Sequence, residues 1–232
     1  MLLEGTLYSN LVETFEKCFI REDRYKLLLS GIGVTVKVAL LAAALGLVIG
    51  FLIALCNLSK KKPLNIIGKI YTDVIRGTPS VTQLMIIYFV IFATVNWEKW
   101  IIAAIAFSIN SGAYVSEIIR AGILSIDKGQ TEAGRSLGLS KSQTMMSIIV
   151  PQAVKNIFPA MCNEFITLIK ETAIVGYVGL VDIQKAGDFI KSATYEAFMP
   201  LIATAIIYFV IIKVLTLLLG RVEKRLRKSD QR

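Results

Sequence analysis

Three polar side chains, Gln83, Asn110 and Glu164, lie near the middle of long apolar segments of the sequence. A charged group at the centre of a bilayer costs about 2.5–3.5 kcal/mol on insertion scales, so such residues usually face a pathway or a partner. A carboxylate at Glu164 could accept the ammonium group of a ligand. The structural alternatives are an ion pair of Glu164 with Lys155 or Lys170, and an interhelical hydrogen bond for Gln83 and Asn110.

The other reactive side chains do not form a catalytic pattern. The sequence has no histidine, which removes the commonest metal ligand and the usual proton shuttle at neutral pH. Cys18, Cys56 and Cys162 lie far apart, and an odd number argues against a disulfide framework. We therefore expect no metal and no cofactor. A membrane-embedded enzyme would need a nucleophile–base or metal constellation at membrane depth, so it is the weaker alternative.

The elements that must position these polar residues are apolar and long. Hydrophobic residues make up 55% of the 232 residues, and the mean hydropathy is +0.64. Gly46 and Gly50 form a small-xxx-small pair that suits close helix packing, and Gly77-Thr78-Pro79 should break the second segment. The pattern predicts an all-α polytopic membrane protein with five transmembrane helices. The predicted spans are about 32–56, 70–94, 100–124, 145–178 and 199–219.

The basic residues predict how these spans are oriented. The net charge of +9 is gathered in short clusters beside apolar runs, such as Lys60 to Lys62, which suits anionic lipid rather than nucleic acid. Fourteen Lys or Arg lie in segments 57–69, 120–141 and 221–232, against seven in segments 1–29, 94–99 and 176–196. The positive-inside rule then places the N-terminus outside and the C-terminus inside.

The two ends of the chain lie outside the predicted spans. Residues 1–30 are predicted to form an amphipathic, extracytoplasmic lead-in. This segment holds nine charged residues and no clean apolar core, so we expect no cleavable signal peptide. Residues 221–232 are expected to form a basic cytoplasmic tail.

Residues 131–151 are too polar to cross a bilayer and separate two apolar segments. Thr131 to Ser136 is predicted to be a short helix with Glu132 in its first turn, where the helix dipole favours an acid. Gly138 should end this helix and turn the chain, and Ser140 is a plausible cap for the next helix. A short helix held between two bends at a membrane surface would fit a groove in a partner protein.

This stretch resembles the cytoplasmic coupling loop of ABC-importer permeases, whose pattern is Glu-Ala-Ala, three residues, Gly, nine residues, Ile-x-Leu-Pro. The sequence departs from the family at Gly134, where Ala is usual, and at Val150, where Leu is usual. Gly134 should weaken the short helix by about 1 kcal/mol relative to Ala. The residues that match, and to which the resemblance gives a role in coupling to an ATPase, are Glu132, Ala133, Gly138, Ile148 and Pro151.

Three further stretches resemble the polar amino acid permeases of the same superfamily. They are Arg76-Gly-Thr-Pro-x-x-x-Gln83-Leu84, Ser111-Gly-Ala-Tyr-x-x-Glu-x-x-Arg-x-Gly122 and Asn163-Glu164-Phe-Ile-x-Leu-Ile-Lys-Glu-Thr172. The resemblance covers about residues 31–220 and implies the permease domain of a type I ABC importer in a bacterial cell membrane. It also implies the partners: a pair of cytoplasmic ATP-binding subunits, a second permease copy or a sister permease, and an extracytoplasmic amino acid-binding protein.

The sequence itself agrees with a role that depends on partners. It lacks a Gly-rich Lys-Ser/Thr loop for phosphate binding, so ATP would be used by separate subunits. An ion-coupled secondary transporter, the main rival, should show an internal repeat, and we find none. A midplane carboxylate fits the ammonium of any amino acid and the side chain of a cationic one. Homodimer and heterodimer both remain compatible with the sequence.

Overall fold

The structure, a computed structural model, describes the backbone of residues 2–227 and the side chains of residues 9–225. The described backbone is helical almost throughout and contains no strand, which confirms the all-α prediction. Short π and 3-10 helical turns join or extend the main helices. The α-helices are α1 (Leu2–Phe15), α2 (Tyr25–Leu58), α3 (Lys62–Arg76), α4 (Ser80–Ile86), α5 (Lys99–Leu124), α6 (Lys128–Ser136), α7 (Lys141–Thr144), α8 (Val150–Glu171), α9 (Ile183–Thr194) and α10 (Phe198–Arg227).

Five segments can cross a membrane, as predicted, when the bent pair formed by α3 and the α4 segment is counted as one span. The other four are residues 25–58, 99–124, 141–178 and 198–225, and the two halves of the bent pair meet at 104°. The helices extend beyond several of the predicted span ends: the helix of the first span begins at Tyr25, before residue 32, and that of the second begins at Lys62, before residue 70. Hydropathy detects only the apolar part of a helix, whereas polar residues that flank the hydrocarbon core continue its hydrogen bonding.

The two predicted end segments are also helical. The lead-in contains α1, followed by the π turn Glu16–Ile20 and the 3-10 turn Arg21–Asp23, and α2 begins before the predicted boundary at residue 30. The expected basic tail is a continuation of α10 as far as Arg227, and residues 228–232 lie outside the described residues.

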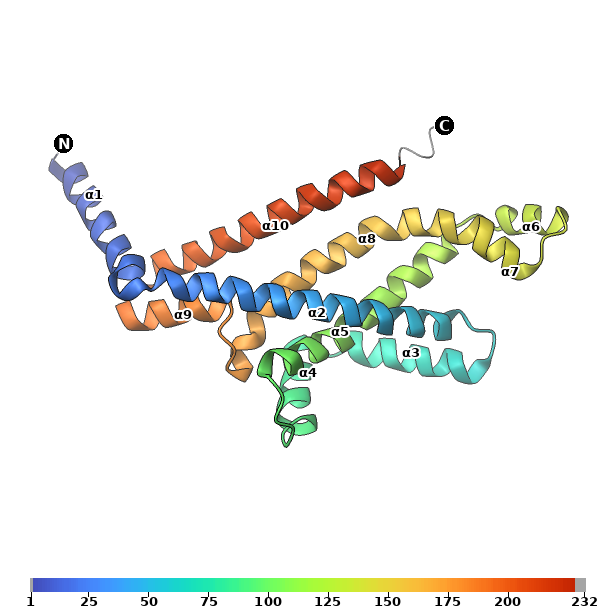
Figure 1. Cartoon of the computed structure of the whole chain (residues 1–232), viewed down its shortest axis with the longest axis horizontal. Helices are drawn as coiled ribbons and strands as arrows, with labels where there is room; N and C mark the ends of the chain where they lie inside the picture. Colours follow the sequence, from blue (N-terminus) through green and yellow to red (C-terminus); the bar gives the residue numbers. More distant parts are fainter. Residues whose placement is uncertain (1, 228–232) are drawn as a thin grey trace.

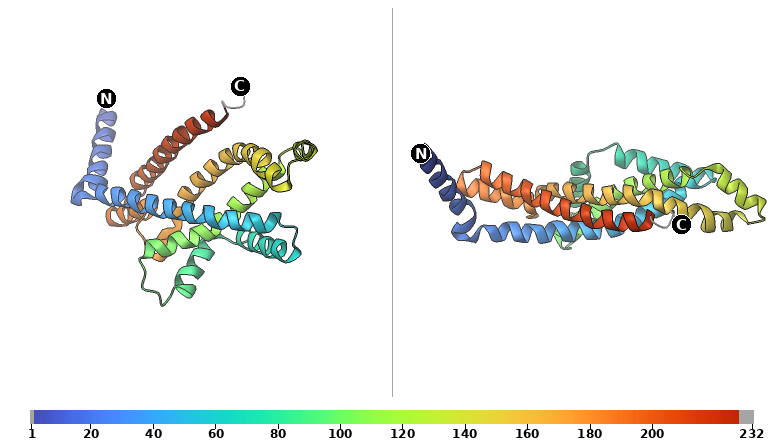
Figure 2. Two further views of the ribbon diagram at one scale, coloured as in Figure 1. Left: turned by 45° about the vertical axis from the view of Figure 1, so that its right-hand side comes forward. Right: turned by 90° about the horizontal axis from the view of Figure 1, so that it is seen from above.

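The helices lie roughly along one long axis. In Figure 1, α6, α7 and the connection between α2 and α3 lie at one end of this axis, and α1 and α9 lie at the other. The views in Figure 2 confirm that the molecule is elongated, with α6 and α7 projecting beyond the other helices. The predicted coupling loop is thus at the same end as the Lys60 to Lys62 cluster.

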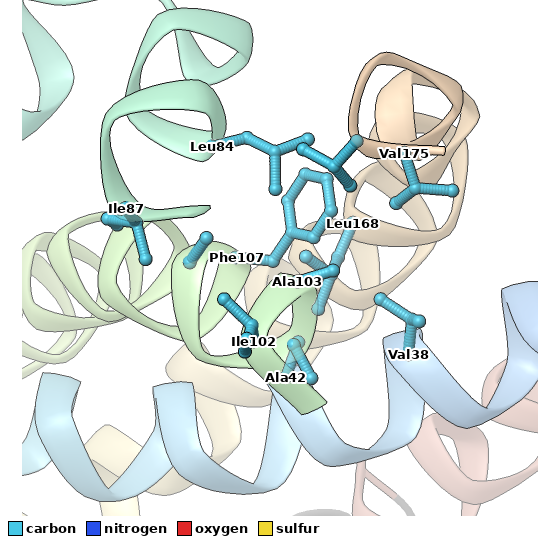
Figure 3. Packing of buried hydrophobic residues seen from close by; sticks show 12 residues of the cluster. Val38, Ala42, Leu84, Ile87, Ile102, Ala103, Phe107, Leu168 and Val175 are labelled. Carbon is cyan, nitrogen blue, oxygen red and sulfur yellow. The ribbon is translucent and has the colours of Figure 1, made fainter. Parts of the chain in front are cut away.

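The core is built where α2 and α5 pack together (Figure 3). Buried side chains of α4, α8 and the 3-10 turn after α8 complete this cluster, with Phe107 of α5 at its centre. Small residues bring the two helices together: Gly46 faces Ser111, and a Cβ at Gly50 would overlap the side chain of Val115. The predicted small-xxx-small pair therefore serves the contact between α2 and α5.

The buried run of α5 also contains polar residues. Ser108, Asn110, Ser111 and Ser116 are all buried, although α5 is one of the spans. Tyr71 of α3 donates a hydrogen bond to the carbonyl oxygen of Ile109 at 2.6 Å. Because α5 packs against α2, α3 and α8, it holds these polar groups at a fixed place between the other helices.

Candidate functional site

The break between α3 and α4 is held together by one side chain. The Nε2 atom of Gln83 donates to the carbonyl oxygen of Ile75 at 2.7 Å and to the hydroxyl of Thr78 at 2.6 Å. Its Oε1 accepts a hydrogen bond of 2.9 Å from Nδ2 of Asn110 on α5. Both amides are buried. Gln83 thus satisfies a carbonyl group that the helix break leaves without a helical partner.

A cavity of about 780 Å³ lies beside this break, on the face of α5 that meets α8. Glu164 lies in its wall and accepts a hydrogen bond of 2.8 Å from the hydroxyl of Ser111. The full lining is Arg76, Tyr114, Glu117, Ile118, Ala121, Gly122, Ser125, Asn156, Pro159, Ala160, Asn163 and Glu164. The cavity therefore joins residues from α3, α5 and α8.

The cavity also contains charged groups from α3 and α5. Arg120 donates two hydrogen bonds to the carboxylate of Glu117, from Nε at 3.0 Å and from Nη2 at 2.8 Å. Such an ion pair is expected for residues three apart on a helix. Arg76 lies near the same carboxylate, with Nη1 at 3.6 Å from its Oε2 atom. The guanidinium of Arg76 also lies over the ring of Tyr114, 5.3 Å from its centre.

The three predicted pathway residues have different surroundings. Glu164 lines the cavity, whereas Gln83 and Asn110 bind each other and are absent from its lining. For the last two, the interhelical hydrogen bond considered as the alternative is present. The hydrogen-bond partner of Glu164 among the described side chains is Ser111. A role of these three residues in a transport pathway stays a prediction.

Sequence reasoning missed Arg76 as a residue of this cavity. The signal that could have found it is its position directly before Gly77-Thr78-Pro79, at the point where a span is broken. The residues around discontinuous membrane helices commonly bind ligands.

The predicted coupling loop is a helical hairpin. Gly138 follows α6 with φ of +83°, and Ser140 and Gln143 form a capping box at the start of α7, so the predicted turn and cap are present. The predicted start at Thr131 is wrong, because Asp127 caps the helix by accepting from the N–H of Gly129 at 2.7 Å.

This earlier start changes the position of Glu132, which lies inside α6 rather than in its first turn. The dipole argument for an acid at that position is therefore wrong. Glu132 and Ala133 are both exposed, so they are available to a partner. Pro151 is exposed in the first turn of α8, and Ile148 is partly buried.

The hairpin is packed against the chain that leads into α8. A Cβ at Gly134 would lie 2.7 Å from Cγ2 of Thr144 and 2.9 Å from Cδ1 of Ile148. On the outer side, Leu137 and Met146 are exposed by 80% and 64%. The helical hairpin, which projects beyond the other helices (Figure 2), thus presents exposed apolar side chains.

Metal chemistry has no evident location in the described part of the chain. There, no group of three or more Cys, Asp or Glu side chains could hold a metal ion. The thiols of Cys18, Cys56 and Cys162 are all free.

The sequence matches a known protein family. Residues 46–228 match the family described as binding-protein-dependent transport system inner membrane component. This range includes the cavity and the hairpin.

Individual relatives cover almost the whole chain. The arginine transport system permease protein ArtQ of Bacillus subtilis (strain 168) is 43% identical over 205 residues, which are 88% of this chain and 94% of the relative. The glutamine transport system permease protein GlnP of Escherichia coli (strain K12) is 35% identical over 204 residues, 87% of this chain and 93% of the relative. The L-cystine transport system permease protein TcyB of Bacillus subtilis is 35% identical over 209 residues, 89% of each chain.

Solved structures show the same fold. A crystal structure of an amino acid ABC transporter with histidines has a TM-score of 0.82 and 43% identity, and the match covers 89% of this chain and 98% of that one. An inward-facing structure of the MetNI methionine ABC transporter has a TM-score of 0.73 at 18% identity, over 87% and 97% of the two chains. The second likeness concerns the fold alone.

Proposed function

We propose how this chain works from one premise: it belongs to the family of binding-protein-dependent transport system inner membrane components and is a permease subunit of an amino acid ABC transporter. In the proposed cycle, the chain moves a polar amino acid inward across the bacterial cell membrane. Hydrolysis of ATP by a separate pair of ATP-binding subunits drives this movement. The chain itself acts as the permease, and because it lacks a Gly-rich Lys-Ser/Thr loop for phosphate binding, the use of ATP falls to the separate subunits.

The proposal rests on the position of Glu164 in the wall of the cavity. This carboxylate lies in a membrane-spanning helix, lines the cavity and has the hydroxyl of Ser111 as its hydrogen-bond partner. A buried carboxylate without a cation is costly by several kcal/mol, so a cationic group of the substrate would be bound favourably. We therefore propose that Glu164 accepts the ammonium or a cationic side chain of the substrate, and that Gln83 and Asn110 fix the broken helix beside this pathway.

The hairpin of α6 and α7 supplies the proposed link to the ATP-binding subunits. It projects from one end of the bundle (Figure 1), and its exposed Leu137 and Met146 suit an apolar groove in a partner. Gly134 of α6 packs against Ile148 in the π turn Met145–Ile149, which runs directly into α8, and α8 carries Glu164. Movement of the ATP-binding subunits would thus be transmitted along α8 to the cavity.

The other proposed partners follow from the topology. With the hairpin end in the cytoplasm, α9 and the N-terminal helices face outward, where an extracytoplasmic amino acid-binding protein would deliver the substrate. A second copy of the chain, or a sister permease, would complete the pathway within the lipid bilayer. Because relatives are named for arginine and glutamine transport, these two amino acids are the first to test.

The test is uptake by the complete complex in proteoliposomes. Glu164→Gln keeps the size and the hydrogen bond from Ser111 but removes the charge, so the substrate concentration for half-maximal uptake should rise while ATP is still hydrolysed. Ser111→Ala is the matched control, because it removes the hydrogen bond and keeps the charge; its effect should be smaller. Wild-type uptake kinetics in Glu164→Gln would overturn the proposal, and loss of folded complex would favour a purely structural role.

Coupling is tested in the same preparation. Glu132→Lys reverses a charge on the exposed face of α6, and Gly138→Leu forces a side chain into a left-handed conformation that costs roughly 1–2 kcal/mol. Both variants should insert normally but lose substrate-stimulated ATP hydrolysis and uptake together. Gly138→Asn, which tolerates this conformation better, should retain more activity. Normal coupled activity in both Glu132→Lys and Gly138→Leu would contradict the assignment of the hairpin.

A further inference from the structure

We infer that Arg76 binds the α-carboxylate of an amino acid whose α-ammonium is bound by Glu164. The cavity would then select free amino acids by their common headgroup. The inference rests on the proposed function, in which Glu164 meets a cationic group of the substrate. It adds a cation from α3 to a site whose sequence candidates lie on α4, α5 and α8, and it assigns the substrate class as amino acids with an unmodified carboxylate.

Arg76 is available because Glu117 is already neutralised. The two hydrogen bonds from Arg120, at 3.0 and 2.8 Å, occupy both oxygens of the Glu117 carboxylate. The 3.6 Å between Nη1 of Arg76 and this carboxylate is too long for a hydrogen bond. Among the described side chains, the remaining contact of the Arg76 guanidinium is the ring of Tyr114, and 43% of the Arg76 side chain is exposed. Its donors can therefore turn to a ligand.

The charges of the cavity thus have two distinct locations. Glu117 is hydrogen-bonded to Arg120 and has only a longer ion pair of 3.6 Å with Arg76, so the carboxylate of Glu164 and the guanidinium of Arg76 are the charged groups of this lining that lack a hydrogen bond to an oppositely charged group. One is negative and the other positive. A zwitterion neutralises both at once, whereas a simple cation or a simple anion would leave one of them without a partner.

The spacing of these two groups suits an α-amino acid. Glu164 binds Ser111, whereas Arg76 lies by Tyr114 and Glu117, and these three positions follow one another on one face of α5. At 1.5 Å per residue, Ser111 lies about 5 Å from Tyr114 and about 9 Å from Glu117 along the axis of α5. The positions of Glu164 and Arg76 along this axis therefore differ by about 5–9 Å. An amino acid headgroup with one contact of about 2.8 Å at each end spans roughly 8 Å.

The chemistry of the residue and the size of the cavity fit the same ligand. A guanidinium presents a planar set of donors that matches a carboxylate with two parallel hydrogen bonds, which a lysine cannot do. The volume of about 780 Å³ lies within the range of ordinary ligand sites and leaves room beyond the headgroup. The side chain of the ligand would then lie toward Asn163 and Asn156, so side chains of different lengths could be accepted.

The experiment measures equilibrium binding to the permease with its ATP-binding subunits in nanodiscs. The extracytoplasmic binding protein is left out, because it could itself recognise a carboxylate. Radiolabelled L-arginine and L-glutamine are the probes, and the unlabelled α-amides, L-argininamide and L-glutaminamide, compete with them. The amides keep the ammonium and the side chain but lack the charged carboxylate.

The wild-type complex should bind the free amino acid at least tenfold more tightly than its amide. Arg76→Gln should weaken amino acid binding at least tenfold and leave amide binding unchanged, so that the preference disappears. Arg76→Lys should keep part of the preference, because the charge remains. Lys69→Gln removes a charge from the same helix at a residue outside this cavity, so it should behave as wild type. Glu117 keeps Arg120 in Arg76→Gln, so no carboxylate is left without a partner.

The outcomes separate this inference from the proposed function. Glu164→Gln should weaken binding of the amino acid and of its amide by the same factor, because both carry the ammonium. If that result holds but wild type and Arg76→Gln show the same preference for the free acid, Arg76 does not bind the carboxylate and the inference is wrong. If the wild-type complex shows no saturable binding of either amino acid, both the proposed site and this inference are overturned.

Discussion

The side-chain amide of Asn110 donates a hydrogen bond of 2.9 Å to Oε1 of Gln83 and so joins α5 to the second half of a broken span. Gln83 then reaches back with Nε2 to the carbonyl oxygen of Ile75, at 2.7 Å, in the first half. Two buried amides therefore connect three helical segments, and the 104° bend between α3 and α4 is fixed by side chains as well as by Pro79.

This pairing predicts a measurable coupling between the two residues. Gln83→Leu should destabilise the protein by about 1–3 kcal/mol, because buried carbonyl groups lose their donor, and Asn110→Leu should cost less. A double-mutant cycle, measured by unfolding in mixed micelles, should give a coupling energy of about 0.6 kcal/mol, and at most about 1.7 kcal/mol. Strictly additive costs for the two single variants would show that the hydrogen bond contributes nothing.

The sequence predicted those features of the fold that are encoded locally. The glycine and proline break after Arg76, the turn at Gly138 and the cap at Ser140 each depend on residues within a few positions of one another, and each is present. The start of α6 was predicted too late. The helix is capped by Asp127, which lies five residues before Glu132, the first residue that matches the family pattern.

The composition of the cavity was less predictable. Residue count placed Gln83, Asn110 and Glu164 at similar depth, but depth does not determine which way a side chain points around its helix. The bend after Arg76 changes the direction of α4 relative to α3, and Gln83 faces α5 whereas Arg76 lines the cavity. A straight second span would place these two residues, seven positions apart, on one helix face.

At Gly134, helix propensity and packing predict opposite effects of an alanine substitution on stability. On propensity alone, Gly134→Ala should stabilise α6 by about 1 kcal/mol. A Cβ there would lie 2.7 Å from Cγ2 of Thr144, and Thr144 cannot rotate freely because its hydroxyl donates to the carbonyl oxygen of Ser140 at 2.9 Å. We expect Gly134→Ala to lower the thermal stability of the complex and to weaken retention of the ATP-binding subunits during purification.

Thr144→Ser supplies the matched rescue for that variant. Serine keeps the hydroxyl and loses the methyl group that the new Cβ would strike, so the double variant should recover most of the lost stability. Thr144→Ser alone should have a small effect. Stabilisation by Gly134→Ala in the wild-type background would show that the hairpin adjusts without cost, and the packing argument would then be wrong.

The orientation in the membrane is tested by cysteine labelling in a background in which Cys18, Cys56 and Cys162 are replaced. The predicted topology rests on the bias of fourteen basic residues against seven. Single cysteines at Lys60 and in the C-terminal tail should react with an impermeant maleimide only from the cytoplasmic side. A cysteine at Trp97, whose side chain is 54% exposed, should react from outside. Labelling of the tail from outside would overturn the five-span topology.

Asp182 lies between two spans and is fully buried. It caps α9 by accepting from the N–H groups of Gln184 at 3.2 Å and Lys185 at 2.9 Å, and its Oδ2 also accepts from the hydroxyl of Tyr208 at 3.0 Å. Burial raises the pKa of this carboxyl above its ordinary value, against the opposite effect of these hydrogen bonds. In the folded state the group therefore retains its proton at pH values where the unfolded chain has lost it.

The raised pKa gives a pH dependence with a definite sign. As the pH rises above the ordinary pKa of aspartate, the unfolded chain loses the proton first, so the stability of the wild type falls by at most about 1.4 kcal/mol per pH unit until the raised native pKa is passed. Asp182→Asn caps a helix about as well but cannot ionise. The stability of the wild type relative to Asp182→Asn, measured by chemical unfolding across acidic to neutral pH, should therefore decline with rising pH and then become constant. A relative stability that instead increases with pH would mean that the hydrogen bonds outweigh burial and that the native pKa is lowered.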